Sequence, residues 1–166
     1  MINSFLTKNF YINTIIAALI FILDRFSKIY VINLDKVNYS SELYQSKHLN
    51  ISLVWNEGIA FGLLSFNQNN LYNLLSFLIA IIIIFIFFMI IRNDNIKRYA
   101  LLMIFAGAIG NLYDRIVYKA VPDFIDFHIG DYHWFIFNVA DIFISLGVFF
   151  MIFFELIDNN KNNEKN

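Results

Sequence analysis

The chain of 166 residues contains no cysteine and a single proline. The lack of cysteine excludes disulfide bonds, thiol catalysis and cysteine metal sites, and one proline leaves no room for a proline-rich linker. Charged residues make up only 15% of the chain, whereas an ordinary soluble domain has about 25%. The net charge of -1 gives no electrostatic reason to expect nucleic acid as a partner.

Apolar residues dominate what remains. Hydrophobic residues account for 59% of the chain and aromatic residues for 19%, with a mean hydropathy of +0.61. Four runs approach the roughly 20 apolar residues that a bilayer-spanning helix needs, at about 10–32, 71–91, 99–118 and 134–157. We therefore predict a membrane all-α bundle of four transmembrane helices in one domain over residues 1–166, with a disordered tail at about 159–166.

Basic residues set the predicted orientation. The short link between the second and third runs holds Arg92, Lys97 and Arg98, and Lys8 precedes the first run. The positive-inside rule then places this link and both termini in the cytoplasm. The first run is predicted to be a retained helix, because residues 24–28 carry charges where a signal peptide would have a small-residue cleavage site.

The two outer segments contain β-strand patterns. Residues 49–55 alternate apolar and polar side chains, and residues 56–58 have the composition of a turn. Residues 124–129 and 132–135 flank Gly130 and Asp131, a pair typical of a hairpin turn. We expect a small extracytoplasmic β-sheet resting on the outer membrane face.

Polar residues recur at helical spacing in the third and fourth runs. The third run has Gly107, Gly110, Asn111, Asp114, Arg115 and Tyr118 at intervals of three or four, and the fourth has Asn138, Asp141 and Ser145. Each set shares one helix face, and the glycines allow close approach of a neighbouring helix. We predict that the two polar faces meet inside the bundle.

Asp141 is the residue that most requires a function. A carboxylate at membrane depth costs at least about 2.5 to 3.5 kcal/mol, which Asn or Ser would largely avoid as helix-packing residues. Asp123 lies in the segment just before this run, and two neighbouring carboxylates can share one proton. This arrangement predicts acid–base catalysis of the aspartic-protease type, in which one carboxylate activates water and the other assists the carbonyl oxygen.

Other chemistries have weaker support. No serine lies in a G-x-S-x-G context and there is no H-E-x-x-H motif. His128 and His133 are interpreted as solvated loop residues and Asp126 as a solvated strand residue, so no metal site and no cofactor are expected. Two alternatives stay open: a small proton-coupled transporter with Asp141 as its carrier carboxylate, and a noncatalytic assembly protein whose polar faces only pack helices.

Five segments together resemble lipoprotein signal peptidase (signal peptidase II), a bacterial membrane aspartic peptidase. These segments are residues 24–28, 56–62, 106–115, 121–127 and 137–141. Taken in the same order, they are similar to the family patterns D-Q-x-T-K, N-x-G-x-A-F, G-G-A-x-G-N-x-x-D-R, V-x-D-F-I-D-F and F-N-x-A-D. The chain departs from these patterns at Arg25, Ser27 and Ala106, and at Lys119, where the family commonly has glycine. Lys119 and Pro122 leave open the path of the loop that carries Asp123.

The resemblance implies that Asp123 and Asp141 are the catalytic pair. It also implies that Asn56, Asn111, Arg115 and Asn138 contact the substrate or support the pair, and that Asp114 holds local helix ends and loops together. Asn56 alternatively serves only as a turn residue before Gly58. Asp24 and Lys28, four residues apart, are expected to form a structural ion pair.

The family's activity would be cleavage of lipidated prolipoproteins just before the diacylglyceryl-modified cysteine. This reaction takes place at the outer face of the bacterial cytoplasmic membrane, where membrane lipids surround the enzyme. The resemblance thus predicts a multi-pass inner-membrane enzyme that acts as a monomer, with its active site near the outer face.

Overall fold

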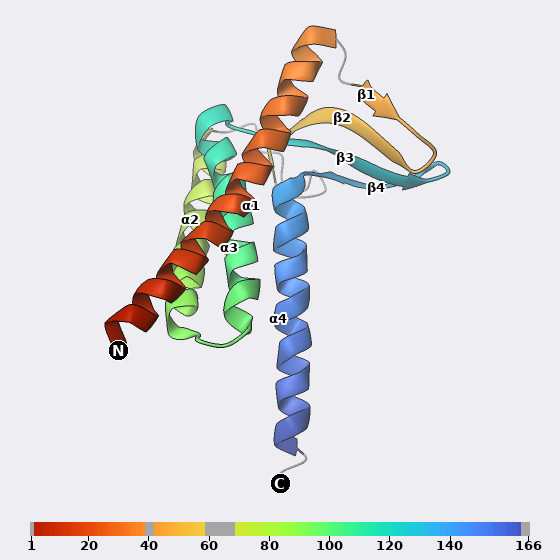
Figure 1. Ribbon diagram of the computed structural model, residues 1–166. Helices are drawn as coiled ribbons and strands as arrows, with labels where there is room; N and C mark the ends of the chain where they lie inside the picture. The colour runs from red at the N-terminus through yellow and green to blue at the C-terminus, as the bar shows by residue number, and fades with distance from the viewer. Residues whose placement is uncertain (1, 39–41, 59–68, 164–166) are drawn as a thin grey trace.

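The computed structural model describes residues 2–38, 42–58 and 69–163 (Figure 1). Within these ranges the chain order is α1, β1, β2, α2, α3, β3, β4, α4. The helices are α1 (Ile2–Asn38), α2 (Asn69–Arg92), α3 (Lys97–Tyr118) and α4 (Val139–Asn163). The strands are β1 (Glu42–Gln45), β2 (Leu49–Asn56), β3 (Val121–Ile129) and β4 (Tyr132–Phe137).

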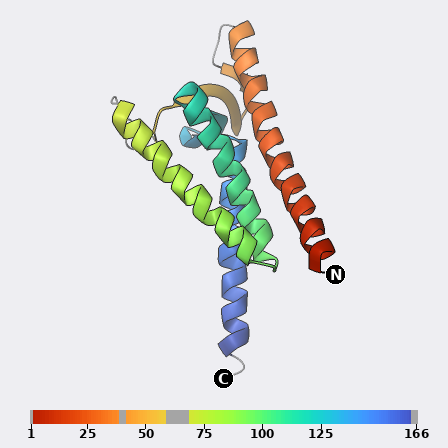
Figure 2. The same cartoon turned by 90° about the vertical axis from the view of Figure 1, so that its left-hand side faces the viewer.

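Helix α3 is the centre of the bundle and packs against α1, α2 and α4 (Figure 2). Its glycines make this possible, as predicted. A Cβ at Gly107 would lie 2.6 Å from the carbonyl oxygen of Ala140, and a Cβ at Gly110 would lie 2.5 Å from Asp24 Oδ2. Any larger side chain at these two positions would push α4 or α1 away from α3.

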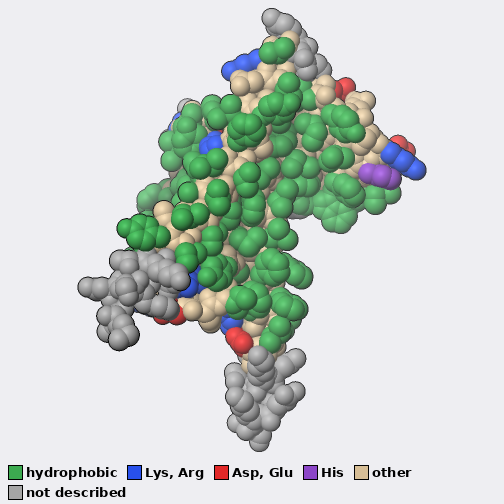
Figure 3. Space-filling model, in the orientation of Figure 1, with side chains coloured by type: hydrophobic (Ala, Val, Ile, Leu, Met, Phe, Trp, Pro, Cys, Tyr) green, Lys and Arg blue, Asp and Glu red, His purple; other side chains and the backbone are tan. Residues whose placement is uncertain are grey.

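Three of the four predicted spans are confirmed by length and composition: Tyr72–Arg92, Lys97–Tyr118 and Val139–Asp158. Apolar side chains cover most of the helical surface on the face shown in Figure 3. Helix α1 has 37 residues and ends at Asn38, six residues beyond the predicted end at about residue 32. It carries Asp24, Arg25 and Lys28. It is not among the three spans found in the described ranges.

The fourth predicted span began too early. Residues 134–137 belong to β4, and α4 starts only at Val139. Bulky aromatic and β-branched residues at 132–137 pair with β3 here, and an apolar run alone does not distinguish a buried helix from a strand. The predicted disordered tail was also wrong over 159–163, where α4 continues to Asn163, while residues 164–166 lie outside the described ranges.

The start of α4 is marked by a reciprocal capping interaction. Asn138 Oδ1 accepts a hydrogen bond from the backbone N–H of Asp141 at 3.2 Å, and Asp141 Oδ2 accepts one from the backbone N–H of Asn138 at 3.1 Å. This is a capping box, in which two side chains satisfy backbone donors that a helix start leaves unpaired. The spacing N-x-x-D thus ends the strand and begins the helix.

The strands form one antiparallel sheet in the order β1-β2-β3-β4, which confirms the predicted strand at 49–55 and the predicted hairpin. Gly130 in the hairpin turn has a φ of +59°, a conformation that favours glycine. The sheet lies at one end of the bundle, opposite the beginning of α1 and the end of α4 (Figure 1). Val31 of α1 packs with Leu53 and Phe124 to hold the sheet against the helices.

Lys119 connects α3 to β3 in a left-handed conformation, with a φ of +58°. This is the position at which the family commonly has glycine, and the lysine adopts the glycine-like backbone angles that it ordinarily resists. The chain therefore reverses direction after Tyr118 and delivers Asp123 to the end of the bundle within five residues.

Candidate active site

A polar cavity of about 270 Å³ lies where the sheet meets α3 and α4. Asp123 of β3 and Asp141 of α4 both line it, so the structure brings the two predicted acids to one site. The remaining lining residues are Asn56, Asn111, Arg115, Val121, Phe135, Ile136, Asn138, Ile144 and Ser145. Each of the predicted supporting residues Asn56, Asn111, Arg115 and Asn138 therefore faces the same space.

Asp123 is held by two amide side chains. Asn138 Nδ2 donates to Asp123 Oδ1 at 2.6 Å, and Asn56 Nδ2 donates to Asp123 Oδ2 at 2.9 Å. The side chain is almost fully buried, and this burial, together with the nearby charge of Asp141, raises the pKa of Asp123 to about 6 even though the Asn hydrogen bonds favour the ionised form. Asp123 is thus a carboxyl group that changes protonation state close to neutral pH.

Asn56 contacts Asp123 and also makes the turn before Gly58 that was considered for it. Its Nδ2 binds Asp123, while its Oδ1 accepts a hydrogen bond from the backbone N–H of Gly58 at 2.9 Å. The second contact is an Asx-type turn, which fixes the amide so that its donor points at Asp123. The family-like segment from residue 59 to residue 62 lies outside the described ranges.

Asp141 is positioned from two helices. Its Oδ2 takes part in the capping box of α4, and its Oδ1 accepts a hydrogen bond from Asn111 Nδ2 of α3 at 2.8 Å. Asn138 connects the two acids, because its Nδ2 donates to Asp123 while its Oδ1 accepts from the Asp141 backbone. The carboxylates therefore share a bridging residue as well as a cavity.

A buried cluster of four charges lies beside this site, between α1 and α3. Lys28 Nζ lies 2.8 Å from Asp24 Oδ1 and 2.7 Å from Asp114 Oδ2, which confirms the predicted Asp24–Lys28 ion pair. Arg25 bonds to Asp24 at 2.7 Å and to both carboxylate oxygens of Asp114. Asp24, Lys28 and Asp114 have essentially no exposed surface, so two cations and two anions neutralise one another inside the protein.

The charge cluster contacts the candidate site through two hydrogen bonds. Lys28 Nζ donates to Asn111 Oδ1 at 2.8 Å, on the opposite side of the amide from Asp141. Asp24 Oδ1 accepts from the backbone N–H of Ala140 at 3.1 Å, in the first turn of α4. The expected roles of Asp24 and Lys28 as structural residues thus extend from α1 to both other helices that carry the site.

Arg115 brings a positive charge to the cavity. Its Nη1 donates to the backbone oxygen of Asn111 at 3.1 Å and its Nη2 to that of Gly58 at 3.3 Å. Its Nε is buried and has no partner among the described residues. Tyr118, which was predicted to share this inward face, instead lies at the surface and packs edge-on against Trp55 with ring centroids 5.5 Å apart.

An apolar cavity of about 430 Å³ adjoins the polar one. Its lining consists of Phe127, Trp134, Phe135, Phe137, Asp141, Ile142, Ser145 and Leu146. Phe135, Asp141 and Ser145 line both cavities. Asp141 is therefore at the boundary between a space suited to hydrocarbon and a space suited to a polar backbone.

The interpretation of Asp126 as a solvated strand residue was wrong, and His128 and His133 lie in strands and not in a loop, although His133 is exposed as expected. Asp126 is 6% exposed, and His133 Nδ1 lies 2.9 Å from its Oδ2. The histidines belong to β3 and β4, where they are directly paired across the hairpin. The sequence signal was present, since Asp126 and His128 stand two residues apart on a strand, but the contribution of β4 depends on register.

Comparisons with known proteins agree with this geometry. Residues 16–157 match the model of the family described as Signal peptidase (SPase) II. A lipoprotein signal peptidase of Pelagibacter ubique is 54% identical over 160 residues, covering 96% of each chain. One from Anaplasma phagocytophilum is 38% identical over 148 residues, covering 87% of this chain and 92% of that relative.

Two solved structures, both of bacterial membrane enzymes, have the same fold. One aligns with a TM-score of 0.67 at 29% identity and covers 90% of both chains. The other aligns with a TM-score of 0.72 at 30% identity and covers 87% of this chain and 91% of that one.

The buried charge cluster generates a prediction about stability. Asp114→Asn removes one anion and leaves Arg25 and Lys28 with Asp24 alone, so we expect a loss of roughly 3 to 5 kcal/mol and a clearly lower unfolding midpoint in detergent. The control is Glu155→Gln, which removes an exposed partner of Lys97 and should cost less than about 1 kcal/mol. Equal midpoints for the two variants would mean that the cluster contributes little.

The raised pKa of Asp123 predicts a pH dependence of stability. Its ordinary value is 3.8 and its folded value is about 6, so between these values the folded state holds a proton that the unfolded state has released. The contribution of Asp123 to the free energy of unfolding is fully present below pH 3.8 and is lost as the pH rises through about 6. This contribution is roughly 3 kcal/mol at most. The unfolding midpoint should therefore fall more steeply with pH in the wild type than in Asp123→Asn. Parallel profiles for the two proteins would contradict the assignment.

Proposed function

Because the chain belongs to the signal peptidase II family and is a peptidase of lipoprotein signal peptides, we propose that Asp123 and Asp141 are its catalytic pair. The observation that carries this proposal is the convergence of the two carboxylates on one polar cavity, bridged by Asn138. Asp123 is buried and Asp141 is half-buried, and both are held by amide donors rather than paired with a cation, which leaves them free to exchange a proton.

The proposed mechanism uses a single proton held between the two carboxyl groups. The ionised carboxylate takes a proton from a water molecule, whose oxygen attacks the scissile carbonyl carbon. The protonated partner donates to the carbonyl oxygen as the tetrahedral intermediate forms. When the carbon–nitrogen bond breaks, the carboxyl group that accepted the water proton gives it to the leaving amine. The partner carboxylate takes a proton back from a hydroxyl of the intermediate, which becomes the new carboxylic acid, and the pair returns to its starting state.

The neighbouring residues have distinct supporting roles in this scheme. Asn56 and Asn138 orient Asp123, and Asn111 orients Asp141, through the hydrogen bonds described above. Arg115 lines the same cavity, and its Nε has no partner within the described ranges. We propose that its charge stabilises a substrate carbonyl and the negative charge that develops on it.

The adjoining cavities suit a substrate that is half peptide and half lipid. We propose that the apolar cavity beside Asp141 takes the hydrocarbon of the diacylglyceryl-modified cysteine, while the peptide bond that precedes this cysteine lies in the polar cavity. Strand β4, which pairs only with β3 within the sheet, offers an edge to an extended peptide. Residues of α4, a candidate spanning helix, line both cavities. A substrate can therefore reach the site from the bilayer.

We further propose that α1 completes a set of four spanning helices, with both termini in the cytoplasm and the sheet and active site near the outer face. The basic residues Arg92, Lys97 and Arg98 at the short α2–α3 link support this orientation. The charged groups of Asp24, Arg25 and Lys28 in α1 face α3 and one another rather than lipid, which makes the passage of this part of α1 through the bilayer physically acceptable. We propose that the chain acts as a monomer, since every residue assigned to the site comes from one copy.

The transporter alternative is not supported. The chain matches peptidases over nearly its whole length, and Asp141 is engaged by both a helix cap and Asn111.

The central prediction concerns the two acids. Asp123→Asn and Asp141→Asn should each abolish cleavage of a purified lipidated prolipoprotein while leaving the protein folded, because an amide can neither accept the water's proton nor share one. The double variant should be scarcely slower than either single variant, since groups that act as a unit lose their contribution together. Cleavage is measured by the shift in mass of the prolipoprotein.

Two controls accompany this experiment. Asp131→Asn, at the exposed hairpin turn, removes an acid of the same charge and should cleave at the wild-type rate. A precursor with serine in place of its lipidated cysteine should remain uncut by the wild-type enzyme. Near-normal cleavage by either Asp123→Asn or Asp141→Asn would end the aspartic-peptidase proposal.

The orientation is tested by cysteine labelling, for which the natural chain provides a cysteine-free background. Single cysteines at Lys47 and Asp131, which are exposed in the sheet's turns, should react with a membrane-impermeant thiol reagent added outside the cell. A cysteine at Asn95, in the α2–α3 link, should react only after the membrane is permeabilised. The reverse pattern would overturn the orientation.

A further inference from the structure

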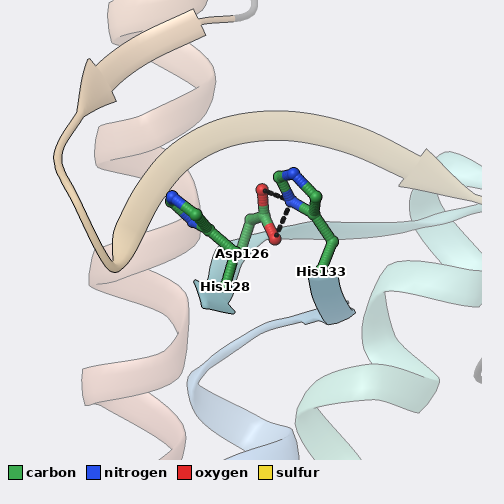
Figure 4. A group of neighbouring side chains, drawn as sticks. All are labelled: Asp126, His128 and His133. Atoms are coloured by element: carbon green, nitrogen blue, oxygen red, sulfur yellow. Dashed lines mark hydrogen bonds and ion pairs between the residues drawn. The ribbon is translucent and has the colours of Figure 1, made fainter. Parts of the chain in front are cut away.

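Three potential metal ligands meet on the β3–β4 hairpin, away from the two catalytic acids. Asp126 and His128 rise from β3 and His133 from β4, all on the same face of the hairpin (Figure 4). One ligand atom from each residue lies within 4.8 Å of the other two. The proposed peptidase mechanism uses none of these side chains, so their convergence requires a separate explanation.

Local strand geometry creates this convergence. The β3–β4 register shifts between Asp126 and His128, an irregularity of the β-bulge type. Bulges turn side chains away from their regular alternation, and here His133 reaches Asp126 although it is paired in register with His128. The two imidazole rings stack with centroids 4.9 Å apart and an interplanar angle of 19°.

The donor atoms fit a small divalent cation. His133 Nδ1 lies 3.0 Å and 2.9 Å from the two oxygens of Asp126. These separations are close to the roughly 3.3 Å between neighbouring donor atoms in a tetrahedral zinc site. The third donor atom, a ring nitrogen of His128, lies within 4.8 Å of the donor atoms of Asp126 and His133. His133 is 52% exposed at its side chain, which gives an ion a route from solvent.

Two polar groups in the cluster are poorly accounted for without an ion. His128 Nδ1 is shielded from solvent and has no hydrogen-bond partner in the described part of the chain. The Asp126 carboxylate is buried, and apart from His133 its contact is the long 3.4 Å hydrogen bond from Asn50 Nδ2. Burying polar groups without good partners is unfavourable, and a cation would satisfy both at once.

We propose that Asp126, His128 and His133 bind one divalent transition-metal ion of the zinc class. Two imidazole nitrogens and one carboxylate are a ligand set that favours zinc, cobalt, nickel or copper over magnesium and calcium, which prefer oxygen donors. Three protein ligands leave a fourth position for water. The site is a second one, distinct from the polar cavity that contains Asp123 and Asp141.

The ion would cross-link the two strands that form one wall of the apolar cavity. Phe127 precedes His128 directly and Trp134 follows His133 directly, and both aromatic side chains line that cavity. Metal binding would therefore hold β3 and β4 together at the hairpin. This metal site stands independently of the catalytic proposal, because its residues, its ligand and its test are all different.

The test is zinc binding to the full-length chain, purified in detergent with a histidine-free tag and stripped with a chelator. Isothermal titration with zinc chloride should show one ion per chain. His128→Gln and His133→Gln should each weaken binding roughly 10- to 100-fold or more. His48→Gln is the matched control, because His48 is the third histidine of the chain and lies exposed in the β1–β2 turn. Its backbone oxygen, which the substitution keeps, accepts a hydrogen bond from the backbone N–H of His128.

Two further measurements make the result independent of any folding defect. Zinc should raise the unfolding midpoint of the wild type and of His48→Gln but not of His133→Gln, whose exposed side chain can be replaced without disturbing the core. Cobalt should give the visible absorption of a four-coordinate ion in the wild type. The variants His128→Gln and His133→Gln should not show this absorption. Failure of the wild type to bind zinc, or an equal loss of binding in His48→Gln, would reduce the cluster to a hydrogen-bonded Asp–His pair and overturn the proposal.

Discussion

The Lys28 ammonium is the group on which the rest of the site depends. It binds Asp24 on its own helix, Asp114 on α3 and the side-chain oxygen of Asn111. An ammonium group can only donate hydrogen bonds, so it requires the oxygen of Asn111 and forces the amide nitrogen to the opposite side, toward Asp141. A charge pair that looks purely structural therefore determines which way an amide of the candidate site points.

Burial is the constraint that organises both acids. Carboxylates inside a membrane protein are costly unless polar groups surround them, and here each one accepts two hydrogen bonds from amide or backbone donors. Amide donors stabilise the ionised form of a carboxylate without neutralising its charge. Arg25 and Lys28, in contrast, neutralise the charges of Asp24 and Asp114. The protein thus contains two pairs of acids. Asp24 and Asp114 are fully buried and paired with cations, whereas Asp123 is buried, Asp141 is half-buried, and both are held by amide donors in a setting suited to proton transfer.

Much of this arrangement could be predicted from local patterns. The glycines and polar residues of α3 recur with the 3.6-residue period of a helix, and so do the polar residues around Asp141 in α4. This period shows which residues share a helix face. The boundary at Asn138 could not be placed from apolarity, because residues 134–137 are as hydrophobic as the helix that follows, although the N-x-x-D capping spacing was a usable signal. Arg25 was visible only as a departure from the family pattern, and its contact with Asp114, 89 residues away, depends on tertiary packing. The same holds for the Asp126 cluster, which exists only in one strand register.

The most direct test of this account is the single-turnover cleavage rate of Asn111→Ala with a lipidated prolipoprotein. This variant keeps both aspartates and all four charges of the cluster, but it removes the donor that holds Asp141 Oδ1 and the acceptor of one Lys28 hydrogen bond. We predict a folded protein whose cleavage step is slower by roughly 100-fold, because a small displacement of a reacting group has an effect of that size, while substrate binding changes little. A folded Asn111→Ala that cleaves at the wild-type rate would show that Asp141 does not need this support and would contradict the account.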